Sequence, residues 1–349
     1  MKTIGIIGGG QLGRMLAMAA ARLNLRTVIL EPQADCPAAQ TATRQIVGAY
    51  DDDQALDALA AACDLVTYEF ENVPVAAAAR LARSLPVFPP PKALEVAQDR
   101  VTEKRFLNAC GLETARFHAV DSLADLKAAL AAFGGQGVLK TRRLGYDGKG
   151  QHVFRDDADD PAAVYAALGA VPLILESFVR FEREISIIAA RGQDGSVLCF
   201  DPAENVHRNG ILATSTVPAA LPADLAESAR AAATAIVDAL DYVGVIGVEF
   251  FATSDGGLAV NEIAPRVHNS GHWTEAACVV SQFEQHMRAV AGLPLGDPSR
   301  HSDCIMHNLI GDEIDQVPAW LAKPRTLVHL YGKAEARPGR KMGHVTTLR

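Results

Sequence analysis

The stretch TIGIIGGGQLG, residues 3–13, decides the fold of the first part of the chain. Its apolar half, Thr3–Ile7, predicts a buried β-strand, and its glycines predict a tight turn. The apolar spacing that follows predicts a helix over Met15–Leu23, and a second strand over Thr27–Leu30 is expected to end at Glu31. The chain therefore opens as a strand, a glycine turn, a helix and a strand.

The glycine turn is also a candidate anion site. The spacing Gly8-x-Gly10-x-x-Gly13 permits close approach of the backbone and places amide donors at a helix N-terminus, which suits phosphate groups. The pattern alone leaves three alternatives open: a turn without a ligand, a mononucleotide or sugar-phosphate site, and a dinucleotide site to which Glu31 contributes.

Strands and helices continue to alternate after the turn. Short apolar strands over Gln45–Val47 and Leu65–Tyr68, separated by an Ala-rich helix over Asp53–Ala62, predict βαβ units and a parallel, doubly wound sheet. The segment PVFPPP at 86–91 cannot continue a helix and marks a linker. We therefore expect an N-terminal Rossmann-like α/β domain over residues 1–98.

The rest of the chain has an α+β pattern. It predicts helices and strands over Asp99–Cys110, Gly137–Lys140, Leu173–Glu176, Glu184–Phe200 and Ala223–Leu240. A hairpin and a basic C-terminal tail follow. We expect a central domain over residues 99–295, with a lid subdomain around 112–180, and a small β-rich C-terminal domain over residues 296–349.

The composition is that of a folded, anionic protein. The 349 residues include 33 Lys and Arg against 41 Asp and Glu, and the resulting net charge of −8 argues against a general nucleic-acid or membrane surface. No apolar stretch approaches the roughly 18 residues that span a bilayer, and the N-terminal run is too interrupted for a signal peptide. The six cysteines have no CxxC or zinc-type spacing, so we expect reduced thiols and a cytoplasmic protein.

A second glycine-rich segment, KTRRLGYDGKGQ at 140–151, carries basic residues. A strand delivers Lys140, and three glycines in six residues then predict a loop that closes backbone amides and Lys149 over a polyphosphate. The Walker spacing GxxxxGK[ST] is absent, which disfavours an ordinary P-loop ATPase. Taken alone, the loop is equally compatible with a basic hairpin turn on a solvated face.

The hairpin formed by residues 245–251 and 258–262 predicts a metal site. A two-residue turn at Asp255-Gly256 places Glu249 directly opposite Glu262. Two carboxylates about 5 Å apart at Cβ repel each other unless a cation neutralises them, and Mg²⁺ is the natural candidate. The alternative is a bulge that shifts the register and leaves one glutamate in solvent.

Polar donors follow this hairpin directly, in the segment APRVHNSGH at 264–272. Arg266 can place a planar fork on an anion that develops charge in a transition state, or it can form a structural salt bridge. His268 and His272 are candidates for the same site, although packing or capping roles explain single histidines equally well.

Six segments together carry a family resemblance. They are GGGQLGRM (8–15), YEFE (68–71), KTRRLGYDGKGQ (140–151), AENVH (203–207), NEIAPRVHNSGHWT (261–274) and the tail from Tyr331-Gly332-Lys333 to Gly343-His344. In this order they resemble the 5-(carboxyamino)imidazole ribonucleotide synthetases, ATP-grasp enzymes of purine biosynthesis, over essentially the whole chain. The resemblance implies a preATP-grasp domain, an ATP-grasp domain, a small C-terminal domain and a homodimer.

The resemblance also implies a reaction. ATP phosphorylates bicarbonate to carboxyphosphate, which delivers its carboxyl group, as CO₂, to the exocyclic amine of 5-aminoimidazole ribonucleotide, and a downstream mutase uses the product. The site fits this chemistry, because carboxyphosphate has to be kept from bulk water and a closing glycine loop would do so. Other hypotheses are a formate-dependent glycinamide ribonucleotide transformylase, a nicotinamide-dependent dehydrogenase and a non-catalytic nucleotide-sensing subunit.

Site roles follow from the resemblance residue by residue. The ATP contacts would be Arg100, Lys140, Gly145, Tyr146, Asp147, Gly148, Lys149, Gly150, Gln151, Glu176, Ser177, Phe178, Val179, Glu184, His207, Asn261 and Glu262. Magnesium would be held by Glu249 and Glu262, and the catalytic groups would be Arg266, His268, Asn269 and Asp147. The imidazole ribonucleotide would contact Gly10, Gln11, Leu12, Glu71, Tyr146, Lys333 and Arg340, the last two at its 5′-phosphate.

Overall fold

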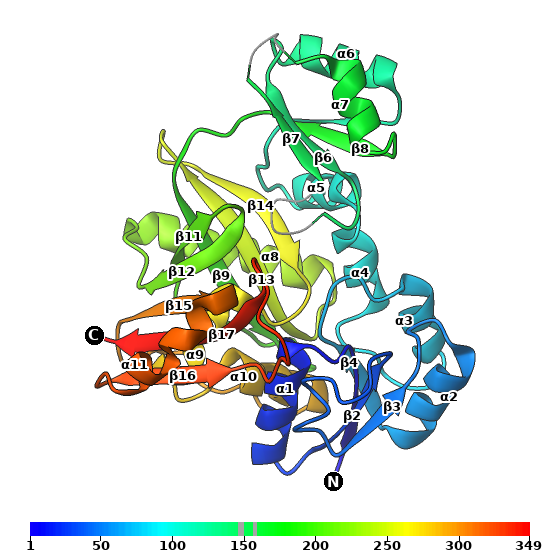
Figure 1. Ribbon diagram of the computed structural model, residues 1–349, viewed down its shortest axis with the longest axis vertical. Helices are drawn as coiled ribbons and strands as arrows, with labels where there is room; N and C mark the ends of the chain where they lie inside the picture. Colours follow the sequence, from blue (N-terminus) through cyan, green and yellow to red (C-terminus); the bar gives the residue numbers. More distant parts are fainter. Residues whose placement is uncertain (146–149, 156–158) are drawn as a thin grey trace.

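The computed structural model describes residues 1–145, 150–155 and 159–349. These residues form three sheets, and each sheet belongs to a different part of the chain (Figure 1). All six cysteines are free thiols. No helix of the described residues combines the length and the apolar character needed to cross a bilayer.

The N-terminal sheet is parallel and doubly wound, as predicted. Its strands follow the order β3-β2-β1-β4, with bounds Thr3–Ile7 (β1), Arg26–Glu31 (β2), Arg44–Val47 (β3) and Leu65–Tyr68 (β4). Its helices are Gln11–Arg22 (α1), Asp53–Ala62 (α2), Val75–Leu81 (α3) and Pro91–Ala97 (α4). Because side chains alternate along a strand, Ile6 packs with α1 on one face while Ile7 packs with α2 and α3 on the other.

A smaller antiparallel sheet forms the subdomain at the top of Figure 1. Its order is β5-β8-β6-β7, with bounds Phe117–Val120 (β5), Gly137–Thr141 (β6), Gln151–Phe154 (β7) and Leu173–Glu176 (β8). Two helices pack on it, Leu123–Ala132 (α6) and Pro161–Ala167 (α7). This subdomain has its own small apolar core, which includes Leu139, Phe154 and Leu175.

The third sheet has nine strands and joins the central and C-terminal parts of the chain. Its order is β14-β13-β9-β11-β12-β15-β17-β16, and β10 pairs with β9. The bounds are Phe181–Arg191 (β9), Val197–Cys199 (β10), Ala203–Arg208 (β11), Ile211–Val217 (β12), Gly244–Thr253 (β13), Leu258–Ala264 (β14), Cys304–Ile310 (β15), Thr326–Leu330 (β16) and Lys341–Leu348 (β17). Because β12 pairs with β15, the C-terminal strands extend the central sheet and do not form one of their own.

Helices link the sheets. Helix α5, Arg100–Ala109, lies beside β14, while α8, Ala223–Ala239, covers the β9 and β13 region of the large sheet. Helix α10, Gln282–Ala291, packs between α1 and the large sheet. The remaining short helices are Asn269–Gly271 (η1), Thr274–Ala277 (α9), Gly311–Gln316 (η2) and Val317–Leu321 (α11).

His286 on α10 ties the N-terminal sheet to the large sheet. Its Nδ1 accepts the Val245 amide N–H at 3.1 Å, so the Nε2–H donates to the Thr67 hydroxyl at 2.8 Å. The ring is fully buried, and burial lowers its pKa to about 3. The neutral ring is therefore part of the folded state.

We expect this histidine to make the fold acid-sensitive. An unfolded histidine takes a proton below about pH 6.5, while folded His286 does not, so its contribution to stability is lost as pH falls from about 6.5 toward 3, by up to about 1.4 kcal/mol per pH unit. Urea denaturation of His286→Gln should show a shallower loss of unfolding free energy between pH 6.5 and 5.5. The exposed control His301→Gln should keep the wild-type slope, and equal slopes in both variants would contradict the prediction.

Candidate active site

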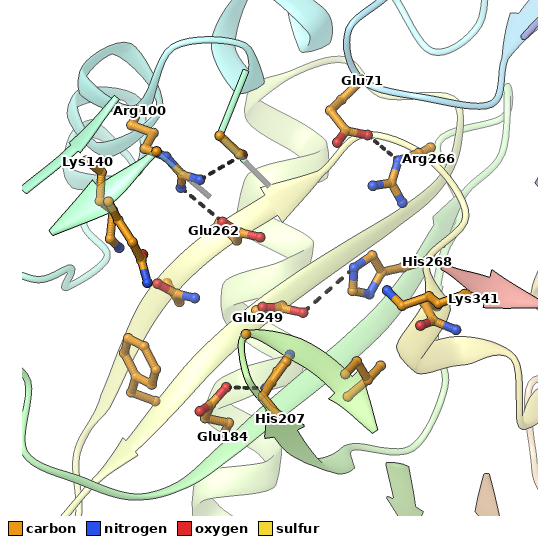
Figure 2. Close-up of a pocket in the computed structure, with 18 of the residues that line it drawn as sticks. Glu71, Arg100, Lys140, Glu184, His207, Glu249, Glu262, Arg266, His268 and Lys341 are labelled. Carbon is orange, nitrogen blue, oxygen red and sulfur yellow. Dashed lines mark hydrogen bonds and ion pairs between the residues drawn. The ribbon is translucent and has the colours of Figure 1, made fainter. Parts of the chain in front are cut away.

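A cleft of about 450 Å³ lies where the N-terminal turn, the small sheet and the large sheet meet. Figure 2 shows acidic and basic side chains facing one another across it. The predicted residues that line it are Gln11, Leu12, Glu71, Arg100, Lys140, Gly145, Gly150, Gln151, Glu184, His207, Glu249, Asn261, Glu262, Arg266, His268 and Asn269. Segments separated by more than 200 positions therefore share one site.

Glu249 and Glu262 lie opposite each other, as predicted, but the predicted two-residue turn is wrong. The turn is one residue longer, because Ala252 pairs with Leu258 and Phe250 with Val260. An uninterrupted ladder from this turn would pair Glu249 with Asn261 and point Glu262 to the other face. A bulge at Asn261 restores the pairing of Glu249 with Glu262, so both Asn261 and Glu262 reach the cleft.

The carboxylate pair is electrostatically strained without a cation. Burial and then the charge of Glu262 raise the pKa of Glu249 to about 7. Arg100 partly compensates, because its Nη1 lies 3.1 Å from the Glu262 Oε2. Two carboxylates and the side-chain oxygen of Asn261 form the hard oxygen set that Mg²⁺ prefers, so the residues fit this ion.

Basic groups from α5 and β6 face the carboxylate pair. Lys140 Nζ lies 2.7 Å from Glu176 Oε2, and Lys104 Nζ lies 3.4 Å from the other oxygen of Glu176. Burial opposes the charge of Glu176, yet the two ammonium groups outweigh it and lower its pKa to about 2. Arg100 also donates to the Gly145 carbonyl at 3.2 Å, at the start of the glycine loop.

The other end of the cleft is organised by Arg266. Its Nε donates to the carboxylate of Glu71 from the N-terminal part, and its Nη1 donates to the Val267 carbonyl at 3.0 Å. Burial opposes the charge of Glu71, but Arg266 lowers its pKa to about 2. Burial and the charge of Arg266 lower the pKa of His268 to about 3, so a neutral imidazole faces Glu249, with its Nε2 3.7 Å from the Glu249 Oε1.

Three family models match the chain. They are a ribonucleotide synthetase preATP-grasp domain over residues 1–98, an ATP-grasp domain over 105–283 and a phosphoribosylaminoimidazole carboxylase C-terminal domain over 304–349. An N5-carboxyaminoimidazole ribonucleotide synthase from Brucella melitensis is 64% identical, over 99% of this chain and 96% of its own. The chain belongs to the N5-carboxyaminoimidazole ribonucleotide synthase family.

Solved structures of this synthase family have the same fold. The ADP complex of one synthetase is 43% identical, with a TM-score of 0.96 over 100% of this chain and 92% of its own. The Aspergillus clavatus synthase, in complex with ADP and 5-aminoimidazole ribonucleotide, is 31% identical, with a TM-score of 0.92 over 100% of this chain and 94% of its own. The predicted α/β architecture is thereby confirmed.

Three backbone amides of the glycine turn donate to carboxylates of the chain itself. Glu69 Oε1 accepts the Gly10 N–H at 2.5 Å, and Glu69 Oε2 accepts the Gly13 N–H at 2.7 Å. Glu31, considered for a dinucleotide ribose, instead accepts the Gly9 N–H at 2.9 Å and the Tyr50 hydroxyl. The amides of Gly9, Gly10 and Gly13 therefore have acceptors within the chain, and the candidate phosphate site at this turn stays a prediction.

Some predicted residues lie outside the cleft. Gly10, Glu176, Ser177, Phe178, Val179, Lys333 and Arg340 do not line it, and Tyr146, Asp147, Gly148 and Lys149 lie outside the described residues. Lys333 Nζ donates to the Lys341 carbonyl at 2.7 Å, and Arg340 donates to the Glu335 carbonyl at 3.0 Å. Lys341, at the start of β17 in the basic C-terminal tail, lines the cleft, and no motif singled it out.

Sequence patterns also missed two aromatic residues of the synthase cleft. Phe181 and Phe251 come from neighbouring strands and stack with ring centroids 4.5 Å apart. Both line the cleft beside Glu184, whose carboxylate lies 2.7 Å from the His207 Nδ1. No motif singled them out: Phe181 precedes the strand predicted over Glu184–Phe200, and cross-strand neighbours cannot be assigned before the register is known.

We expect Glu69→Ala to destabilise the synthase by about 1–3 kcal/mol, because the half-buried Gly10 amide and the buried Gly13 amide at the start of α1 lose a carboxylate acceptor. Urea denaturation at pH 7.5 measures the loss. Glu95→Ala, on the exposed face of α4, is the matched control and should change the unfolding free energy by less than about 0.5 kcal/mol. Equal values for the two variants would show that Glu69 does not cap the turn.

Proposed function

We infer that this protein is an N5-carboxyaminoimidazole ribonucleotide synthase. It uses ATP and bicarbonate to carboxylate the exocyclic amine of 5-aminoimidazole ribonucleotide, and it releases ADP and phosphate. The observation that carries the inference is a cleft in which the Glu249–Glu262 pair and the Arg266–His268 group lie together with basic side chains of the small sheet. This arrangement suits transfer of a phosphoryl group to a small anion.

The nucleotide end of the cleft holds ATP. Lys140 and Arg100 bind the phosphates, and Glu184 and His207 lie at the end of the cleft where Phe181 and Phe251 form an aromatic wall. Glu249, Glu262 and Asn261 would hold Mg²⁺, which neutralises charge on the phosphates when it is bound. Gly145, Gly150 and Gln151 line the cleft next to Lys140, where a loop that covers ATP would exclude water.

The other end positions bicarbonate. Glu71 and the Val267 carbonyl accept two hydrogens of Arg266 and thereby fix the plane of its guanidinium. Held in this plane, the guanidinium binds bicarbonate and stabilises the charge that develops as its oxygen attacks the γ-phosphoryl group. Neutral His268 and Asn269 orient the same anion, and Asn269 is itself fixed by reciprocal amide bonds of 2.9 and 2.8 Å with Asn308.

The amine substrate enters from the N-terminal side. Gln11 and Leu12 line the cleft next to Glu71, and Lys341 lines it from the C-terminal strand. We place the ribonucleotide between these two walls, so that its amine meets the carboxyl group released from carboxyphosphate. Lys333, one of the residues expected at the 5′-phosphate, adjoins the C-terminal wall of the cleft, because its ammonium group donates to the Lys341 carbonyl. A positively charged C-terminal segment suits a phosphate group.

The wider setting is also part of the proposal. We propose domain boundaries at residues 1–98, 99–295 and 296–349, a cytoplasmic homodimer, and a product that passes to a mutase. Light scattering of the purified protein tests the dimer, which predicts twice the chain mass of 37.0 kDa.

Activity with different acids tests the proposed function. Purified protein with Mg²⁺, ATP and 5-aminoimidazole ribonucleotide should release ADP only when bicarbonate is present. Formate with glycinamide ribonucleotide, the substrates of the related transformylase, should not support ADP release. Turnover with formate, or no turnover with bicarbonate, would refute the proposal.

We expect Arg266→Ala to lower kcat by more than about tenfold, because the transferring phosphoryl group and bicarbonate lose a charged donor. Steady-state ADP release at saturating bicarbonate measures the effect. The exposed arginine Arg83 provides a matched control, since Arg83→Ala removes the same charge far from the cleft. An Arg266→Ala enzyme with wild-type kcat would exclude a catalytic role for this side chain.

We expect Glu262→Gln to lower turnover by more than about tenfold and to raise the Mg²⁺ concentration for half-maximal activity, because one carboxylate of the pair is lost. A Mg²⁺ titration at fixed ATP measures both effects. Glu182→Gln, an exposed substitution on β9, should leave the titration unchanged. A Glu262→Gln enzyme with the wild-type Mg²⁺ titration would remove this residue from the metal site.

A further inference from the structure

The bulge lies on β14, which is the edge strand of the large sheet. Strand β14 therefore has a neighbouring strand of this sheet, β13, on one side only. A bulge leaves backbone groups without ladder partners, and buried groups of this kind need other partners. On its other side β14 meets helix α5, and the Val260 N–H donates there to the Glu113 carbonyl at 2.7 Å. Residues 100, 103 and 104 of this helix lie on one face, because they are three and four positions apart.

Each of three consecutive residues of the bulge contacts a different side chain of α5. Lys104 Nζ donates to the Asn261 carbonyl at 3.4 Å, and Glu103 Oε1 accepts the Ile263 N–H at 2.7 Å. Between them, Arg100 Nη1 donates to the Glu262 carboxylate at 3.1 Å. The helix thus holds the backbone on both sides of Glu262 as well as its side chain.

Glu103 and Lys104 are each only 2% exposed, although both are ionisable. Burying such groups is unfavourable, and an edge strand could be covered by apolar side chains at lower cost. Lys104 is paired with Glu176, which also binds Lys140. A chain of contacts therefore runs from a lysine of the cleft on β6, through Glu176 and Lys104, to the backbone of the bulge.

We propose that Glu103 and Lys104 are positioning residues, which hold the β14 bulge so that Asn261 and Glu262 face Glu249 in the geometry that binds Mg²⁺ and nucleotide. Lys104 does not line the Glu249–Glu262 cleft, and Glu103 lines only a smaller neighbouring cavity of about 70 Å³ that shares Glu262 with it. Both side chains therefore act on the carboxylate pair through their bonds to the strand. The inference rests on the proposed function of that cleft. A displacement of 1 Å of a catalytic group can lower the rate about a hundredfold. Loss of the two hydrogen bonds that hold this backbone can therefore lower the rate substantially.

Glu103→Met tests the inference, because it keeps the volume of the side chain and removes the acceptor for Ile263. We expect kcat to fall at least about tenfold and the Mg²⁺ concentration for half-maximal activity to rise at least about fivefold. Glu103→Gln keeps an acceptor oxygen and should stay within about threefold of wild type. Arg105→Met, an exposed substitution on the same helix, should match wild type.

Calorimetric titration with ADP supplies a readout that does not depend on turnover. Wild-type protein should bind ADP more tightly with Mg²⁺ than without it, while Glu103→Met should bind metal-free ADP normally and lose at least about fivefold of the Mg²⁺ enhancement. An unchanged Mg²⁺ enhancement in Glu103→Met overturns the inference. Equal weakening with and without Mg²⁺ also overturns it, because that result indicates a general structural defect.

A second variant and the activity of the wild-type protein complete the test. If Glu103→Met does not fold, Lys104→Met is measured in the same way, with the same expected loss and the same overturning results. If wild-type protein lacks bicarbonate-dependent ADP release, the proposed function fails, and the calorimetric comparison still tests the positioning role. If wild-type protein is active and Glu103→Met behaves like it, only the positioning role fails.

Discussion

Repulsion between two buried carboxylates is the constraint on which the site depends. Glu249 and Glu262 face each other across β13 and β14, and burial together with the charge of Glu262 raises the pKa of Glu249. Nearby positive charge stabilises the two carboxylates, and Arg100 on α5 supplies part of this charge. In the proposed function, a divalent cation and a polyphosphate would relieve this repulsion.

The same principle of paired charge joins the separate parts of the chain. Arg266 on the large-sheet side binds Glu71 of the N-terminal part, and Lys140 of the small sheet binds Glu176. Buried ion pairs add little net stability, but breaking one is costly because the other charge is left without a partner. They therefore fix the orientation of the cleft walls, while apolar packing around α1 and α10 supplies the cohesion.

The hairpin of β13 and β14 shows which features could be predicted from the sequence and which could not. The pairing of Glu249 with Glu262 was predicted from a two-residue turn, and the pairing is confirmed although the turn is longer. The bulge at Asn261 restores this register, but no local sequence pattern predicted the bulge. Its contacts Glu103 and Lys104 come from a helix about 160 positions earlier in the chain. Local patterns predict strands well and long-range backbone partners poorly.

The sequence by itself determined the order and type of the elements, the doubly wound N-terminal sheet, the family resemblance and most residues of the cleft, because periodicity, turn residues and contiguous motifs are local properties. Only the tertiary structure decided which groups of the glycine turn and of the basic C-terminal tail have partners in the chain or line the cleft. Glu69 accepts the Gly10 and Gly13 amides of the turn, and Lys341 rather than Arg340 lines the cleft. The physical reason is that the acceptors of the Gly10 and Gly13 amides and the place of Lys341 depend on distances between residues far apart in sequence, which local patterns do not specify.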